Sequence, residues 1–452
     1  MNRLSKYFAI LFTLCLFSCT KDFLEPELTK DKDVATNVNT IDDLKGIMAG
    51  AYNRMNESDY YGRDYIVFAE VRSDNAFSSG SSGRFVSPAQ FVMTSNDAYS
   101  TDTWSQIYSV IVNANIVIQS EITGNDTPEV QYVKGQAYAV RALAHMDLLR
   151  LFGQQYVTGG TLGVPIITAY NDGNIYPKRA TIEEVWNQVG ADFAKAIEIM
   201  DPSLDGTSPT QITTWAVYAL QSRYYLYIKD YAKAATAAKK VIDSGNFSIL
   251  SKGEYDGYWN NPGEGHSLFE LAYTNSDNPG NGSLFYIYEA TNYGDIQVTK
   301  DLYNSYDNAD VRKKLYSVDE SVYRMIGKYP EYTSSIKVIR YEEVILNYAE
   351  ALYHLESMED ATDYLNLIAE NRSNYSYETV SLDDILEERR KELAMEGHRS
   401  YDLLRNGLSI PYVDSRQTFN KTGIAYGSAS LAFPIPRGEI TANPNMVQNE
   451  GY

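Results

Sequence analysis

The residues of this sequence that could do chemistry do not stand at the spacings that catalytic or metal sites use. The four histidines are at positions 145, 266, 354 and 398. No two of them are four residues apart, the spacing that places two metal ligands on one helix face. The sequence has no G-x-S-x-G motif, no Walker-type phosphate loop and no G-x-G-x-x-G motif after a strand. We therefore expect a protein that is not an enzyme and has no metal site or cofactor.

Carboxylates are abundant, and the densest group of charges lies between Glu387 and Arg405. Its acidic and basic residues recur three or four positions apart, as they do along one face of a helix. Such a pattern fits a helix with ion pairs along it, partly buried against its neighbours. A catalytic pair of carboxylates is the alternative, but a glycosidase requires a defined separation between them, which a sequence does not give. The spacing favours the ion-paired helix.

Composition narrows the classes of partner. The chain has 39 Lys and Arg against 59 Asp and Glu, a net charge of −20. This charge argues against binding nucleic acid or an anionic membrane surface, because both need a basic face. Tyrosine is enriched, at 39 of 452 residues. Its ring is apolar and its hydroxyl is polar, so a surplus of tyrosine favours binding surfaces that stay in contact with water.

The N-terminus has the features of an export signal. Met1–Lys6 is basic, and Tyr7–Phe17 is an apolar run too short to span a bilayer. Leu16-Phe17-Ser18-Cys19 resembles a bacterial lipobox, in which the cysteine is acylated, for example with palmitate. We expect a signal peptide over residues 1–18 and a lipidated tether over 19–39, with Cys19 as the only membrane attachment. An ordinary secretory signal is the alternative.

Helical periodicity dominates the remainder, residues 40–452. Capping boxes begin at Thr40, Thr181 and Ser381. Two segments, 215–242 and 344–369, each predict a pair of helices, with breaks near 229–231 and 357–360. Alanines in the second helix of each pair permit close antiparallel packing, as in tetratricopeptide hairpins.

Three long stretches without a helical period interrupt the helices. They are residues 59–96, 255–306 and 418–452, with a short alternating segment over 267–273. Long loops on a rigid base are usually functional. We therefore predict a predominantly all-α fold of tetratricopeptide-like hairpins, with a ligand-binding layer of long loops and minor strands. It would form one domain, with an N-terminal helical part over 40–250, and a loop layer and C-terminal helical part over 251–452.

Several segments together resemble one known family. They are, in order, Trp104–Asn115, Gly135–Gly153, Gly163–Ile166, Val338–Ala351, Glu388–Arg405 and Phe433–Tyr452. Following the N-terminal lipobox, they resemble the SusD/RagB family of outer-membrane nutrient-binding lipoproteins over essentially the whole chain.

The resemblance implies a lipid-anchored protein of the cell outer membrane that faces outside the cell. It would capture oligosaccharide and pass it to a SusC-like TonB-dependent transporter, without catalysis. A RagB-like protein that binds peptide is the alternative within the same architecture. A surface glycoside hydrolase and a structural subunit that never contacts ligand are further alternatives.

The resemblance also implies two ligand-binding regions, within residues 59–96 and 273–293. A sugar ring stacks on aromatic rings through its C–H face and pairs its hydroxyls with polar side chains. The candidates in the first region are Asp74, Phe77, Arg84 and Asn96, and those in the second are Tyr273, Tyr286, Tyr288 and Tyr293. Neither region contains a tryptophan, which leaves a peptide or a short glycan open. Each tyrosine could instead be a buried packing residue, and Trp259 could be an exposed platform or a packed lid.

Overall fold

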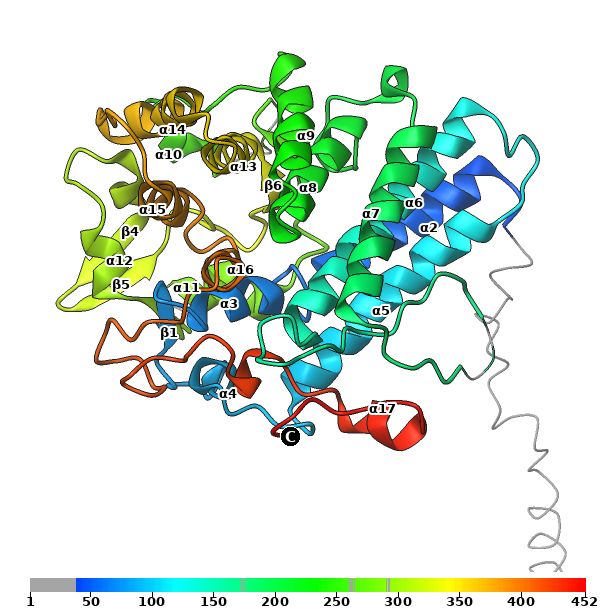
Figure 1. The fold of residues 1–452 in the computed structure, drawn as a ribbon, viewed down its shortest axis with the longest axis horizontal. Coiled ribbons are helices and arrows are strands. Elements are labelled where there is room, and N and C mark those ends of the chain that lie inside the picture. The colour runs from blue at the N-terminus through cyan, green and yellow to red at the C-terminus, as the bar shows by residue number, and fades with distance from the viewer. Residues whose placement is uncertain are drawn as a thin grey trace, which may run out of the picture.

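Helices make up most of the regular structure of this chain (Figure 1). The computed structural model describes residues 38–452 apart from 172, 174, 260–262, 264, 290 and 292. The predicted signal peptide, Cys19 and the tether up to residue 37 lie outside the described residues. Within the described part, no helix is both long and apolar enough to span a bilayer.

Four long helices form the N-terminal layer, on the right of Figure 1. They are α2 (Ile41–Asn56), α5 (Ala98–Gln119), α6 (Pro128–Phe152) and α7 (Ile182–Ile199). The predicted capping boxes at Thr40 and Thr181 are both formed. Helix α6 packs against α2, α5 and α7 and is buried along almost its whole length. Its Arg141 is satisfied by Asp192 of α7, at 2.6 and 2.8 Å.

Two helical hairpins follow, as the sequence predicts. One is α8 (Thr214–Tyr227) with α9 (Tyr231–Asp243), and the other is α13 (Tyr341–His354) with α14 (Met358–Ser373). The breaks contain Lys229 and Glu356, both with left-handed backbone. Ala234 of α9 and Ala351 of α13 are buried together, so the hairpins approach closely where small side chains allow it. The tetratricopeptide-like scaffold is confirmed.

The charged segment 387–405 is not one helix, contrary to the prediction. Helix α15 (Leu382–Glu392) ends, and α16 (Arg399–Arg405) begins after a turn in which Met395 and Gly397 have positive φ. The turn folds the segment back on itself. Its charged side chains therefore contact neighbouring elements of the fold instead of lining one face of a single helix. The interpretation as an ion-paired structural segment holds, but the segment is almost fully buried.

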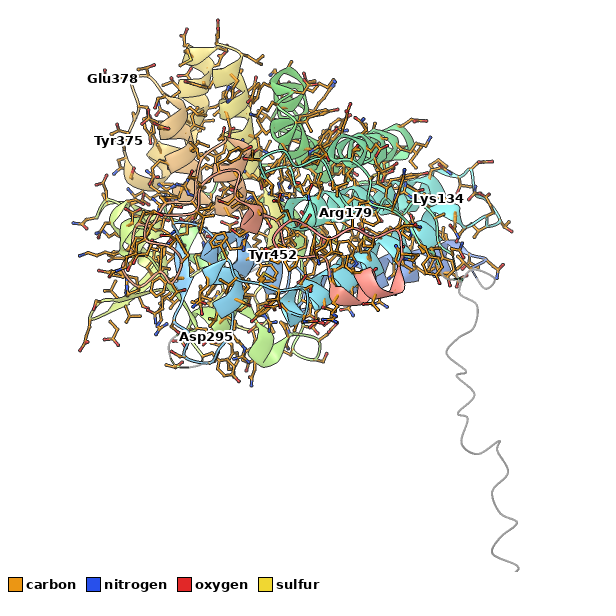
Figure 2. All side chains as sticks on the ribbon, turned by 60° about the horizontal axis from the view of Figure 1, so that its bottom comes forward. Lys134, Arg179, Asp295, Tyr375, Glu378 and Tyr452 are labelled. Atoms are coloured by element: carbon orange, nitrogen blue, oxygen red, sulfur yellow. The ribbon has the colours of Figure 1, made fainter. Side chains whose placement is uncertain are left out.

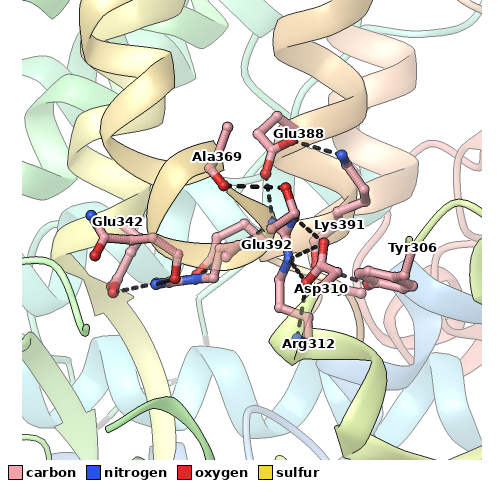
Figure 3. Close-up of polar contacts among 12 residues, drawn as sticks. Tyr306, Asp310, Arg312, Glu342, Ala369, Glu388, Lys391 and Glu392 are labelled. Atoms are coloured by element: carbon pink, nitrogen blue, oxygen red, sulfur yellow. Dashed lines mark hydrogen bonds and ion pairs between the residues drawn. The ribbon is translucent and has the colours of Figure 1, made fainter. Parts of the chain in front are cut away.

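Glu392 lies at the centre of a network of buried ion pairs (Figure 3). Arg340 contacts it at 2.8 Å, Arg372 at 3.0 Å and Arg312 at 3.1 Å. Burial alone would raise the pKa of Glu392, but these three guanidinium groups hold it well below its usual range. The network joins segments far apart in the sequence and fixes the base of the loop layer.

The loop layer carries short helices and two small antiparallel sheets. Its helices are α3 (Asp64–Val71), α4 (Val86–Gln90), α10 (Tyr255–Tyr258), α11 (Leu284–Tyr288) and α12 (Lys300–Asn304). One sheet has the order β1-β3-β5-β4, and the other pairs β2 with β6. The strands are β1 (Ala76–Ser78), β2 (Ser267–Leu271), β3 (Ile296–Val298), β4 (Tyr316–Asp319), β5 (Val322–Met325) and β6 (Ile336–Arg340). In β1, Phe77 opposes Gln297 of β3.

The C-terminal segment returns to the helical layer through α17 (Arg437–Ala442). Phe433 to Pro436 is not helical, as its two prolines predict. Asn449 donates hydrogen bonds to the carbonyl oxygens of Phe152 and Phe433 and accepts one from Arg179. The C-terminal segment is therefore hydrogen-bonded to the last residue of α6. Short 3-10 turns complete the structure at Pro202–Leu204, Gly280–Gly282, Val311–Leu315 and Ala429–Leu431.

Candidate functional site

Four aromatic rings and one arginine gather on the surface of the loop layer. We call them the aromatic surface; its members are Arg84, Phe285, Tyr286, Tyr293 and Tyr332. Tyr286 stacks on Tyr332 with ring centroids 6.1 Å apart and also contacts Tyr293 at 5.9 Å. Phe285 contacts both Tyr286 and Tyr332. Tyr293 and Tyr332 are 40% and 45% exposed, so their rings are accessible to a ligand.

Helix α11 decides which residues of the run LFYIY reach this surface. Ser283 caps the helix by accepting a hydrogen bond from the Tyr286 N–H. One helical turn places Leu284, Ile287 and Tyr288 on the inner face, where all three are buried. Phe285 and Tyr286 lie on the other side and stay partly exposed. The positions two residues apart in the sequence, 286 and 288, therefore have opposite environments.

Arg84 brings the first loop region to the aromatic surface. Its guanidinium lies over the Tyr293 ring, 4.0 Å from the ring centroid, a cation–π contact. One of its nitrogens is 3.6 Å from a carboxylate oxygen of Asp295. Arg84 is thus held between a ring and a buried carboxylate, with part of its head group open to solvent.

A polar cavity of about 370 Å³ adjoins the aromatic surface. Its lining includes Trp259, Tyr273, Asn275, Glu331 and Ser334. Tyr273, Glu331 and Ser334 also line a narrow crevice whose walls include Phe285 and Tyr332, so the cavity and the aromatic surface are continuous. The Tyr273 hydroxyl donates to the carbonyl oxygen of Asn56 at 2.6 Å, which holds the ring in place at the cavity wall.

Trp259 is a packed residue and not an exposed platform. It is buried beside α10, with Arg340 and Lys328 against its ring. It therefore links the ion-pair network to the wall of the cavity.

Four of the predicted ligand residues lie elsewhere. Asp74 is buried and paired with Arg399 and Arg390. Phe77 is buried in β1 beneath Arg416, and Tyr288 is buried against Tyr329. These three placements correct the expectation that the side chains are open to ligand, because each is enclosed by packing or ion pairs. Asn96 is exposed, but it lies in the turn before α5, close to where Ser95 accepts a hydrogen bond from the Arg437 N–H.

Sequence reasoning missed Phe285 and Tyr332. Tyr332 lies between β5 and β6 in the stretch Pro330-Glu-Tyr-Thr-Ser-Ser335, whose proline and polar residues indicate an exposed turn. An aromatic residue in such an exposed turn is the feature of the sequence that could have identified Tyr332 as a candidate for ligand binding.

Over the described residues, no three His, Cys, Asp or Glu side chains are placed to hold a metal ion. His145 is buried in α6, where its Nε2 accepts a hydrogen bond from the Ile167 N–H. Burial, with the charge of Arg141, lowers the pKa of His145 to about 3, as suits a neutral structural histidine.

Comparisons with known proteins agree over the whole described chain. A family model described as "SusD family" matches residues 169–452, and one described as "Starch-binding associating with outer membrane" matches 22–226. SusD-like protein P38 of Formosa agariphila is 25% identical over 100% of this chain and 99% of its own length.

Two solved structures have the same fold. A putative sugar binding protein from Bacteroides vulgatus is 31% identical, with a TM-score of 0.84 over 92% of this chain and 99% of that one. A SusD superfamily protein from Bacteroides thetaiotaomicron is 33% identical, with a TM-score of 0.83 over 91% of this chain and 99% of that one.

Proposed function

The chain belongs to the SusD family, and on this premise we propose that it is a cell-surface lipoprotein that binds oligosaccharide and passes it to a SusC-like TonB-dependent transporter. The resemblance inferred from the sequence is confirmed at the level of the family. Acylation at Cys19 would anchor the protein in the outer membrane, with the loop layer facing outside the cell. Binding and release, without catalysis, would be its whole role.

The aromatic surface is the observation that carries this proposal. Sugar rings present C–H faces that pack on aromatic rings, and Tyr286, Tyr293 and Tyr332 form one group of neighbouring, partly exposed rings. Arg84 and the polar cavity supply donors and acceptors for hydroxyl groups. Delivery to a transporter requires release, so we expect micromolar affinity, about −8 kcal/mol.

A peptide is the second candidate ligand, because the same tyrosines and the cavity would also suit an extended chain. A single experiment separates the candidates. The soluble form, residues 20–452, is applied to an array of oligosaccharides and peptides, and the strongest ligands are measured by isothermal titration calorimetry.

We expect micromolar binding to at least one oligosaccharide, about tenfold weaker binding to it in Tyr286→Ala, and no binding in the peptide set. Tyr375→Ala, which removes an exposed tyrosine near the end of α14, is the matched control and should bind normally. Binding only to peptides would favour the RagB-like alternative, and turnover of a glycan would favour a hydrolase.

Anchoring and partnership have their own tests. Radiolabelled palmitate should label the wild-type chain but not Cys19→Ser, and protease added to intact cells should digest the anchored protein. Purification of the tagged protein from outer membranes should bring a TonB-dependent barrel with it. Absence of label, protection from protease, or purification without a barrel would each contradict the corresponding part of the proposal.

A further inference from the structure

Asp295 is a buried carboxylate to which no described residue donates a hydrogen bond. It precedes β3, is 1% exposed, and neither of its carboxylate oxygens accepts a hydrogen bond from any residue that the structure describes. Its nearest cation is Arg84, at 3.6 Å. In Figure 2 it lies near the lower edge of the molecule, while Tyr375 and Glu378 lie near the upper edge.

Two other buried carboxylates, Asp74 and Glu343, are well satisfied. Asp74 accepts two hydrogen bonds from Arg399, and Glu343 accepts two from Arg223, at 2.6 to 2.8 Å. A buried charge that lacks such donors is costly to keep, so an unsatisfied one requires an explanation. The Arg84 guanidinium also has no hydrogen-bond acceptor among the described residues, but it is 31% exposed and therefore open to water or to a ligand.

We propose that Arg84 and Asp295 form a polar subsite that binds neighbouring hydroxyl groups of an uncharged sugar ring. A hydroxyl both accepts and donates, so one group can accept from Arg84 while it, or its neighbour on the ring, donates to Asp295. Arg84 is 31% exposed and sits on a flexible stem, so its head group can rotate away from Asp295 to admit the ring. Tyr293, already packed under Arg84, would then contact the face of the sugar.

The charges of the subsite favour a neutral ligand. An acidic group that paired with Arg84 would lie close to the Asp295 carboxylate and would take away its counter-charge. Arg324 of β5 is the other arginine beside Gly294 and Asp295, and it already donates a hydrogen bond to the Gly294 carbonyl oxygen at 2.6 Å. The subsite therefore discriminates against uronic acids and sulfated sugars. This inference rests on the proposed function and adds the class of sugar.

The test uses a pair of ligands that differ in charge. One is the neutral oligosaccharide that binds most tightly on the array, and the other is the same compound after oxidation of its primary alcohols to carboxylates. Affinities of both are measured by calorimetry for the wild type, Asp295→Asn and Tyr286→Ala.

We expect the wild type to bind the neutral compound at least tenfold more tightly than the oxidised one. Asp295→Asn should bind the neutral compound about tenfold more weakly and should narrow the difference between the two ligands. Arg84→Gln, on the exposed side of the pair, is a second variant that should also weaken neutral binding about tenfold, in case Asp295→Asn does not fold.

Two results would overturn the inference while leaving the proposed function in place. The first is weakened binding in Tyr286→Ala with wild-type affinity in both Asp295→Asn and Arg84→Gln. The second is equal affinity of the wild type for the neutral and the oxidised ligand. If the wild type bound no oligosaccharide, the proposed function would fail and this inference with it.

Discussion

Arg399 donates two hydrogen bonds to Asp74, at 2.7 and 2.8 Å, across 325 positions of the sequence. The pair joins the turn between α3 and β1 to the start of α16. A residue that the sequence places among the candidates for ligand binding is therefore part of the frame that supports the ligand-binding layer.

Asp74→Asn should destabilise the protein without changing glycan binding. The substitution leaves the buried guanidinium of Arg399 without its counter-charge, which typically costs about 3–5 kcal/mol. Chemical denaturation measures this loss, and calorimetry on the folded variant measures affinity. Asp301→Asn is the control, because Asp301 contacts Arg390 at the half-exposed edge of the same region and should cost about 1 kcal/mol or less. A stable Asp74→Asn that no longer binds glycan would contradict this prediction.

Glu392→Gln should be among the most destabilising single substitutions. Three guanidinium groups contact this carboxylate, so removal of its charge takes one shared counter-charge away from three buried cations, at a cost of about 3–5 kcal/mol. Urea denaturation measures the change. Glu387→Gln, five residues earlier and partly exposed, is the matched control and should have a small effect. Equal effects of the two substitutions would show that the network does not stabilise the fold.

The ion pair of Glu343 with Arg223 should make stability depend on acid pH. Burial alone would raise the pKa of Glu343, but Arg223, with smaller contributions from its neighbours, lowers it to about 2 from its ordinary 4.5. A lowered pKa means stability that is fully present above pH 4.5 and is lost as the pH falls towards 2.

We therefore expect Glu343→Gln to cost about 3 kcal/mol at pH 7 and progressively less as the pH falls from 4.5 to 2. Denaturation of both proteins at a series of pH values gives the comparison. A difference between them that stayed constant over this range would contradict the assignment.

Tyr286 and Tyr332 should act together in glycan binding. Because their rings stack on each other, removal of one changes the position of the other, so the two substitutions should not be additive. We expect each alanine variant to lose about tenfold in affinity and the double variant to lose clearly less than a hundredfold. Calorimetry on the four proteins of this cycle measures the coupling, and strict additivity would indicate that the rings contact ligand independently.

Asn449→Ala should loosen the closure of α6 by the C-terminal segment. The side chain donates to the carbonyl oxygens of Phe152 and Phe433 and accepts from Arg179, all in a buried position. Loss of these partners should cost about 2 kcal/mol or more in unfolding free energy. Asn445→Ala, at an exposed position of the same segment, should cost much less. Equal costs would contradict a closing role for Asn449.

The helices were predictable from the sequence because their signals are local. Thr40, Thr181 and Ser381 form capping boxes through residues three positions away, and such patterns need no knowledge of the fold. The break after Glu392 was missed, although Gly397, which adopts a positive φ, was the available signal.

The site was harder to predict because exposure depends on distant partners. Asp74 and Asp295 are the same residue type in similar loops, yet Arg399 satisfies the first and no described donor satisfies the second. The sequence does not distinguish Tyr286 from Tyr288, because both are tyrosines of the same short run. The helical turn of α11 leaves Tyr286 partly exposed and buries Tyr288.

The Glu392 network and the aromatic surface are held by different kinds of contact. The network unites segments from Arg312 to Glu396, whereas the turns that present the rings are closed by local hydrogen bonds, such as Tyr293 N–H to the Tyr286 carbonyl oxygen. Sequence changes in those turns can therefore alter which nutrient is recognised while the frame keeps its geometry. Evolution could diversify these turns, and a protein engineer could transplant them, without having to redesign the interior.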